Sequence, residues 1–209
     1  MVSDHGMSIT LHKDDLPDGL DLGRVVAIDS EAMGLRPERD RLCVVQLSSG
    51  DGKAHLVQLR PGAYAAPNLR RLLADPHRLK LFHFARFDLA VLRRYLQVDC
   101  RPVYCTKVAS RLARTYTDRH GLKDVVRELL GIELDKAEQS SDWGADQLTE
   151  TQMHYAARDV LHLHAVRAKL DSMLAREGRM ELAQACFDFL PIRAQLDLAG
   201  WPEQDIFAH

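Results

Sequence analysis

The chain has 209 residues, of which 46% are hydrophobic and 28% are charged, and its formal net charge is -2. This length supports one domain with a substantial core, and the composition excludes a disordered or fibrous chain. No apolar run reaches the length of a membrane span, and residues 1–10 lack the basic and apolar segments of a secretory signal, so we predict a cytoplasmic protein with no membrane partner.

The cysteine spacing and the net charge narrow the possible classes of protein only a little further. Cys43, Cys100, Cys105 and Cys186 form no C-x-x-C pair, so neither a zinc site nor a disulfide framework is indicated. A near-neutral total leaves nucleic-acid partners open, because they require only a local basic surface.

The first part of the chain predicts strands. Residues 8–12 are typical of an edge strand, and residues 25–28 form a short β-branched run typical of a strand buried on both faces. Residues 42–47 and 54–59 predict two more strands joined by a hairpin turn at residues 49–52. The run at 25–28 and these two strands are therefore expected to pair as three antiparallel strands.

The second part predicts mainly helices. A helix at residues 69–73 ends before Pro76, residues 79–82 fit a parallel strand, and residues 86–95 have helical spacing. From Val103 onward the pattern is helical, and the expected helices cover 106–114, 122–130, 149–177 and a last pair broken at Pro191. We expect an α/β fold, a mixed sheet with three antiparallel strands flanked by helices, in a single domain over residues 1–209.

Two acids follow the buried strand at residues 25–28. Asp29 and Glu31 lie on the same side of this strand because side chains repeat every second residue. Two carboxylates this close raise each other's pKa unless a cation lies between them, and a hard divalent ion with oxygen ligands is the simplest solution. Taken alone, Asp-x-Glu is more often the end of a strand that simply runs into solvent.

Further acids occur at two later positions. Asp88 falls in the first turn of the helix at 86–95, where the helix dipole favours an anion. Tyr155 and Asp159 are four residues apart in a helix and therefore lie on one face of it. Each feature alone is common in helices that have only a structural role.

Taken together and in this order, the three sites resemble the DEDD exonuclease superfamily, in the subclass with a tyrosine before the last aspartate. The chain is therefore similar to the ribonuclease D family over about residues 20–175, and it most resembles the compact nanoRNase C branch of that family. Ser30 stands where the family often has threonine. The segments that carry the resemblance are 40–52, 106–112, 114–124, 141–143, 155–160 and 200–209.

The resemblance implies a ribonuclease H-like fold and no helical HRDC domain after it. It also implies that Asp29, Glu31, Asp88 and Asp159 hold two divalent ions, Mg²⁺ or Mn²⁺, about 4 Å apart, with Asp29 between both ions. Tyr155 would orient the attacking water rather than act as a base, because a phenol has a pKa of about 10.

The residues expected to bind substrate surround these motifs. By resemblance, Leu35 wedges between the last two bases, although a buried loop leucine fits the same position. Seven basic residues against two acids between Arg101 and Arg127 can attract phosphates, although a solvated helix face explains any one of them as well. The predicted contacts are Ser30, Met33, Gly34, Leu35, His83, Phe84, Phe87, Lys107, Arg111, Tyr116, His120, Lys136, Gln139 and Ser141.

The last segment of the chain is unusually apolar for an end. Trp201, Ile206 and Phe207 are costly to leave in water, so we expect the tail at residues 199–209 to dock on its own domain or on a neighbour. Residues 176–209 as a whole are expected to take part in oligomer contacts. The nanoRNase C branch forms rings. The resemblance therefore predicts a homo-oligomer, and the assembly that we consider is an octamer.

The leading hypothesis is a metal-dependent 3′-5′ exoribonuclease that degrades short RNA, dinucleotides included, to nucleoside 5′-monophosphates. The enzymatic alternative trims longer RNA 3′ ends, as ribonuclease D does, or degrades single-stranded DNA. The alternative from another class is a non-catalytic nucleic-acid-binding module of nuclease fold, for which the loss of at least one acid is expected.

Overall fold

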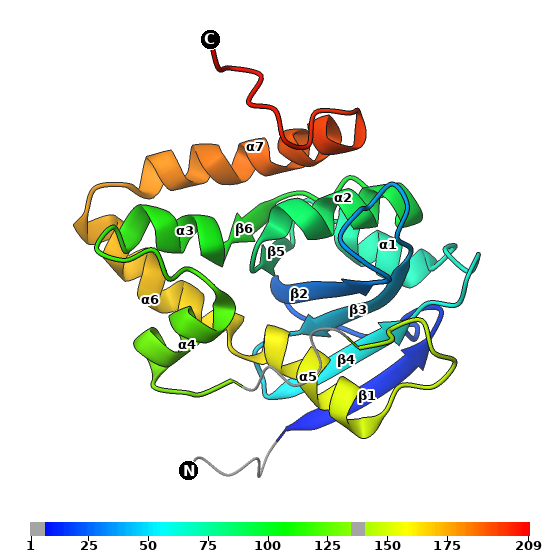
Figure 1. Ribbon diagram of the computed structural model, residues 1–209. Coiled ribbons are helices and arrows are strands. Elements are labelled where there is room, and N and C mark those ends of the chain that lie inside the picture. Colours follow the sequence, from blue (N-terminus) through cyan, green and yellow to red (C-terminus); the bar gives the residue numbers. More distant parts are fainter. Residues whose placement is uncertain (1–6, 135–140) are drawn as a thin grey trace.

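The computed structural model describes residues 7–134 and 141–209, and over these residues it contains a six-stranded sheet in the order β1-β4-β3-β2-β5-β6 (Figure 1). The strands are β1 (Ser8–Lys13), β2 (Val25–Ala32), β3 (Leu42–Ser48), β4 (Lys53–Gln58), β5 (Leu79–Phe82) and β6 (Val103–Cys105).

The strand directions confirm the predicted mixed sheet. β2, β3 and β4 are antiparallel neighbours, β5 runs parallel to β2, and β1 lies at the edge, parallel to β4. The prediction missed β6, which pairs in parallel with β5. This strand has three residues and continues directly into a helix at Thr106, so it is too short to show an alternating pattern.

Seven helices surround the sheet within the described residues. α5 packs across β2, β3 and β4, whereas α7 lies along α2, α3 and β6, as Figure 1 shows. Within residues 7–134 and 141–209, none of these helices combines the length and apolar character needed to cross a bilayer. The helices are α1 (Pro67–Ala74), α2 (Ala85–Leu96), α3 (Thr106–Ala113), α4 (Leu122–Leu130), α5 (Glu150–Leu161), α6 (Leu163–Arg176) and α7 (Met180–Leu198).

The single helix expected over 149–177 is wrong, because the chain breaks at His162 into α5 and α6. α5 buries Ala156 and Val160 and packs on the sheet. α6 buries Leu170 and packs mainly on α3 and α4. Because α5 and α6 pack on different surfaces, one straight helix could not make both sets of contacts.

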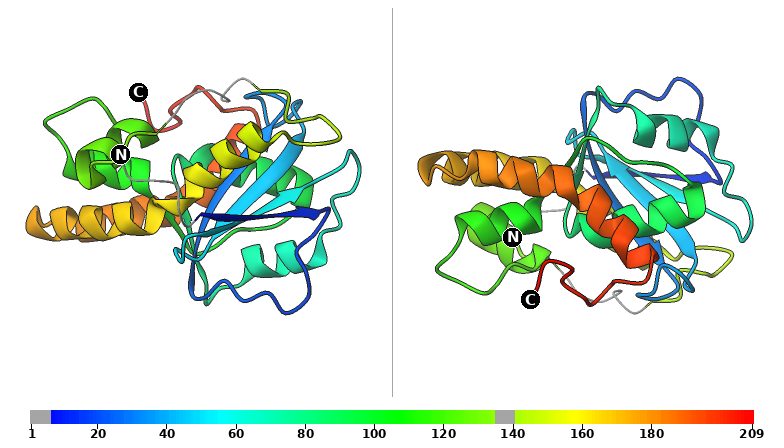
Figure 2. Two further views of the ribbon diagram at one scale, coloured as in Figure 1. Left: turned by 90° about the horizontal axis from the view of Figure 1, so that it is seen from below. Right: turned by 90° about the horizontal axis from the view of Figure 1, so that it is seen from above.

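The expected break at Pro191 is also wrong, since Pro191 lies inside the continuous helix α7. A proline removes one backbone hydrogen bond and bends a helix without necessarily ending it. Pro191 is buried next to Leu190, and Figure 2 shows α7 bending in its second half, so packing against the domain maintains the helix on both sides of the bend.

Candidate active site

The carboxyl end of β2 carries the first two acids. Asp29 pairs with Gln46 and Glu31 with Val44 across the antiparallel ladder to β3, on the side of the sheet covered by α5. Ser30 points to the opposite side because side chains alternate along a strand. β5 is parallel to β2, so the start of α2, which follows β5, lies at the same edge of the sheet.

Three carboxylates converge at this edge. Asp29, Glu31 and Asp159 each offer one oxygen, and these atoms all lie within 4.8 Å of one another. Each residue is half-buried. α5 crosses β2 and β3 at this point, so it brings Asp159 to two acids that precede it by about 130 residues of chain.

Asp88 joins the group from the other side of β2. It is buried in the first turn of α2, and its Oδ1 accepts a hydrogen bond of 2.6 Å from the Ser30 hydroxyl. Burial raises the pKa of Asp88, and the charge of Asp29 raises it further. Alternation along β2 thus links Ser30 to Asp88 while Asp29 and Glu31 meet Asp159.

The electrostatics of the carboxylate cluster favour the binding of a cation. Burial raises the pKa of Asp29 to about 7, and burial together with the charges of Asp29, Asp159 and Asp88 raises the pKa of Glu31 to about 10. Burial and Asp29 also raise the pKa of Asp159. A hard divalent ion fits this all-oxygen donor set, because it would neutralise the surplus negative charge.

Gln46 is a site residue that the sequence reasoning missed. It is fully buried, its Nε2 donates to Asp29 Oδ2 over 3.4 Å, and its Oε1 has no hydrogen-bond partner among the residues that the structure describes. A polar side chain within the apolar run of residues 42–47 was the signal that could have found it.

Tyr155 lies on the same side of α5 as Asp159, as the four-residue spacing predicts. Burial and the charges of Asp159, Glu31 and Asp29 raise the pKa of Tyr155, so the phenol stays protonated. Its ring lies 6.1 Å from that of Trp143, centroid to centroid. The side chain is therefore a neutral hydroxyl held beside the carboxylates.

The start of α5 is anchored to the loop before it. Thr149 and Gln152 form a capping box, and Gln152 Nε2 donates to the Ser141 hydroxyl over 2.7 Å. Ser141, a predicted substrate contact, thus accepts a hydrogen bond that helps to position the start of α5. Lys136 and Gln139 lie outside the described residues.

Exposed apolar side chains occur close in the chain to Glu31 and to Asp88. Leu35 is 86% exposed, Met33 51% and Phe84 46%, which excludes a buried role for Leu35 within this chain. A cavity of about 320 Å³ is lined by residues that include Leu35, Phe84, Phe87, Leu198 and Pro202. Gly34 packs so tightly on Asp40 that an added Cβ would lie 2.3 Å from its carboxylate.

The tail forms part of that cavity and is tied to the domain. Asp197 at the end of α7 accepts hydrogen bonds from Arg86 and Arg193, and both guanidiniums also donate to tail carbonyls, those of Pro202 and Trp201. The tail therefore docks on its own domain, while Trp201, Ile206 and Phe207 remain 43%, 41% and 76% exposed.

Basic and imidazole groups lie beyond Phe84. Lys107 Nζ stands 4.2 Å from the centroid of the Phe84 ring, and Arg111 is exposed one turn further along α3. His83 Nδ1 lies 2.8 Å from the Thr106 hydroxyl, and burial, with a smaller effect of Lys107, lowers the pKa of His83 to about 3. His83 is thus a neutral side chain.

Tyr116 and His120 belong to the loop between α3 and α4. The Tyr116 hydroxyl donates to Glu128, and the ring is 66% exposed. His120 Nδ1 lies 2.9 Å from the Ser110 hydroxyl.

Known proteins share the sequence and the fold. A family model described as 3′-5′ exonuclease matches residues 14–175. Ribonuclease D of Gluconacetobacter diazotrophicus is 39% identical over 156 residues, which are 75% of this chain and 39% of that protein. This chain thus spans about two fifths of the length of the curated relatives that it first matches.

Several solved structures share the fold of this chain. Brucella melitensis NrnC bound to pGG is 53% identical with a TM-score of 0.94, over 97% of this chain and 99% of that chain. Brucella melitensis NrnC with bound Mg²⁺ is also 53% identical, with a TM-score of 0.93 over 97% of this chain and 100% of that chain. Escherichia coli RNase D, an exoribonuclease involved in structured RNA processing, is 27% identical with a TM-score of 0.72, over 82% of this chain and 45% of that chain. Because the family model spans most of its residues, this protein belongs to the 3′-5′ exonuclease family.

Proposed function

We propose that this protein is a metal-dependent 3′-5′ exoribonuclease that cleaves short RNA, dinucleotides included, to nucleoside 5′-monophosphates. The observation that carries the proposal is the convergence of Asp29, Glu31 and Asp159 within 4.8 Å, with Asp88 hydrogen-bonded to the intervening Ser30. The similarity over nearly the whole chain to a nuclease solved with pGG supports the substrate class.

The four carboxylates would hold Mg²⁺ or Mn²⁺. When bound, such ions would supply the activation of a water and the stabilisation of charge on the departing 3′ oxygen. Asp29 would be the central ligand, since burial raises the pKa of Glu31, Asp88 and Asp159 and the charge of Asp29 raises each of them further. Tyr155, neutral and beside Asp159, orients the attacking water through its hydroxyl.

The apolar and basic residues hold the substrate. Leu35, Met33, Phe84 and Phe87 contact the bases near the scissile bond, and the cavity beside Leu35 has room for a flat ring. Lys107 and Arg111, with His83, Tyr116 and His120, lie on the side where phosphate oxygens need hydrogen-bond donors. Ser30 and Gly34 shape the backbone around the acids.

Labelled RNAs test this function. Time courses with 5′-labelled RNAs of about two to twenty nucleotides should show mononucleotide release in the presence of Mg²⁺ or Mn²⁺ and fastest turnover of the dinucleotide. Equal turnover of long and short RNAs would contradict the dinucleotide preference and favour the alternative function, the trimming of longer RNA 3′ ends.

Replacing one acid separates catalysis from binding. Asp159→Asn should lower the rate by about a thousandfold, because metal catalysis contributes several kcal/mol, while the circular dichroism spectrum stays unchanged. Asp146→Asn, an exposed acid in the loop before α5, is the matched control and should leave the rate unchanged. A fully active Asp159→Asn variant would refute the role of Asp159 as a metal ligand, whereas RNA binding by the wild-type protein without any cleavage would favour the nucleic-acid-binding module.

The exposed apolar residues at the end of the chain support a homo-oligomer, with an octamer as the form to test. Phe189 and Ile192 of α7 are 38% and 39% exposed, and the Phe207 ring lies 6.0 Å from that of Phe189. Covering such a patch with a second copy removes it from water. Sedimentation velocity should give a species larger than a monomer, which Phe207→Asp weakens, and a monomer at all concentrations would exclude the assembly.

A further inference from the structure

Leu35 is a large apolar side chain that stands out in water. It is 86% exposed, the largest fraction among the exposed large apolar residues that the structure describes. Its loop follows β2 directly, and Leu35 lines one cavity together with Phe84 and Phe87, which come just before Asp88 in the chain. A free leucine would gain by folding onto this apolar surface, so its exposure points to a loop that holds it in place.

Asp40 organises the loop that carries Leu35. Its side chain is 9% exposed. Its Oδ1 accepts from Arg39 Nε over 2.6 Å, and its Oδ2 accepts from the Arg36 backbone N–H over 3.0 Å and from Arg39 Nη2 over 2.9 Å. The Arg36 carbonyl in turn accepts from the Asp40 backbone N–H over 2.7 Å. Both backbone groups of Arg36, the residue after Leu35, are therefore bound to Asp40.

The residue before Leu35 is packed against the same carboxylate. A Cβ added to Gly34 would lie 2.3 Å from Asp40 Oδ2 and 2.8 Å from Asp40 Cγ, so only a glycine fits beside this carboxylate. The carboxylate cannot easily swing aside, because hydrogen bonds hold both of its oxygens. Since Gly34 and Arg36 flank Leu35, the backbone of the leucine is fixed from both sides.

We infer that Asp40 is a positioning residue: its carboxylate holds Gly34 and Arg36 and thereby keeps Leu35 extended toward the bases of the RNA. This inference rests on the proposed nuclease function, because it requires RNA at the cavity that Leu35 lines. A leucine that is already in place loses little conformational entropy when it packs on a base, so substrate binding is strengthened. Asp40 itself does not contact the RNA in this assignment, since both of its oxygens are used within the loop.

Hydrogen exchange in the full chain tests the loop without any RNA. The backbone N–H groups of Arg36, Arg39 and Asp40 are hydrogen-bonded within the loop, so mass spectrometry should show slow deuterium uptake in the peptide 33–40. Asp40→Asn places an amide N–H against a donor, because both carboxylate oxygens accept, and should speed this uptake by about tenfold.

The peptide that covers β3 is the internal reference for this measurement and should exchange in Asp40→Asn as it does in the wild type. An equal acceleration in β3 would make Asp40 merely structural and refute the inference. Wild-type uptake in the peptide 33–40 as fast as in an unfolded chain overturns the inference even if the enzyme cleaves RNA.

A double-mutant cycle on a 5′-labelled dinucleotide tests whether Asp40 acts through Leu35. Asp40→Asn should raise KM by about three- to tenfold with a smaller change in kcat, because the leucine is no longer held in place. Leu35→Ala should raise KM at least as much, and in that background Asp40→Asn should change KM by less than about twofold. The inference is overturned if either single variant leaves KM unchanged, or if Asp40→Asn has its full effect without Leu35.

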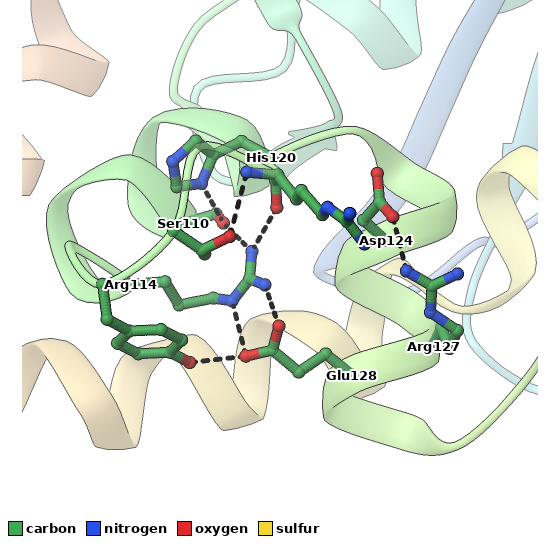
Figure 3. A network of polar contacts seen from close by, with 9 residues as sticks. Ser110, Arg114, His120, Asp124, Arg127 and Glu128 are labelled. Atoms are coloured by element: carbon green, nitrogen blue, oxygen red, sulfur yellow. Dashed lines mark hydrogen bonds and ion pairs between the residues drawn. The ribbon is translucent and has the colours of Figure 1, made fainter.

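Two other aspartates serve as controls. Asp14 accepts from the Arg60 backbone N–H over 3.0 Å and from its guanidinium, which is the same kind of contact as at Asp40. Asp124 accepts from Arg127 Nη2 over 2.7 Å within α4, as Figure 3 shows. Neither aspartate lines the cavity, so Asp14→Asn and Asp124→Asn should leave KM unchanged. A rise in KM as large as that of Asp40→Asn in both controls would refute a specific role of Asp40.

The exchange and kinetic measurements also separate this inference from the proposed function. If the protein cleaves no RNA although the loop is protected, the proposed nuclease function has failed and the positioning role fails with it. If RNA cleavage is normal and the loop is unprotected, only the inference fails.

Discussion

Tyr155 beside Asp159 is a neutral phenol in a field of carboxylates, since burial and three neighbouring acids raise its pKa. A group that stays protonated can orient a water but is a poor base. Tyr155→Phe should therefore lower kcat by about a hundredfold with a KM within about threefold of the wild type. Single-turnover kinetics on a labelled dinucleotide would measure this, and an unchanged kcat would remove Tyr155 from the mechanism.

Gln46 acts on the acids from the neighbouring strand. Its amide donates to Asp29, while its buried Oε1 is unpartnered among the described residues, so Gln46→Leu should change the free energy of unfolding by less than about 1 kcal/mol. Loss of a partner that orients a metal ligand should raise the Mg²⁺ concentration for half-maximal activity by about tenfold. Gln195→Leu on α7 is the control, and an unchanged Mg²⁺ titration for Gln46→Leu would show that Asp29 needs no such support.

Among the elements, α5 contributes two site residues, and its first turn determines where they lie. Thr149 accepts from the Gln152 backbone, and Gln152 donates in turn to Ser141 and to the Asp142 carbonyl. Thr149→Ala should lower stability by about 1 kcal/mol, which is about 2–4 °C in melting temperature for a protein of this size. Thr149→Ser keeps the cap and should melt like the wild type, and an equal loss in both variants would contradict the capping role.

At the scale of the whole molecule, several carboxyl groups lie together in one site. The stability of the folded protein therefore depends both on pH and on bound metal. The pKa of Asp29 is raised from 3.8 to about 7 and that of Glu31 from 4.5 to about 10, so the folded, metal-free protein holds these protons more tightly than the unfolded chain. Their contribution to stability is complete below the unfolded pKa values and is lost as the pH rises through the folded ones.

Metal-free protein should therefore melt at lower temperature at pH about 9 than at pH about 6, and Mg²⁺ should raise the melting temperature more at the higher pH. Differential scanning fluorimetry with chelator or with excess Mg²⁺ measures both effects. In Asp29→Asn the pH effect should shrink, because one of the interacting charges is gone. A metal effect that is the same at both pH values would contradict the coupling.

Local patterns in the sequence determined the acidic strand, the hairpin at 49–52 and the mixed sheet, because a period of two residues and turn chemistry are properties of neighbouring residues. The same reasoning placed Asp29 and Glu31 on one side of β2 and Tyr155 and Asp159 on one face of α5. It failed at β6, which is too short to show a pattern, and at His162 and Pro191, where packing against α2, α3 and α4 overrides local preference.

Only the tertiary structure decided which distant groups meet. The contacts between Gln46 and Asp29 and between Ser30 and Asp88 depend on strand register and helix packing. A sequence names the residues but not the distances between them, because each contact joins segments that are neighbours only after the sheet and helices have packed together.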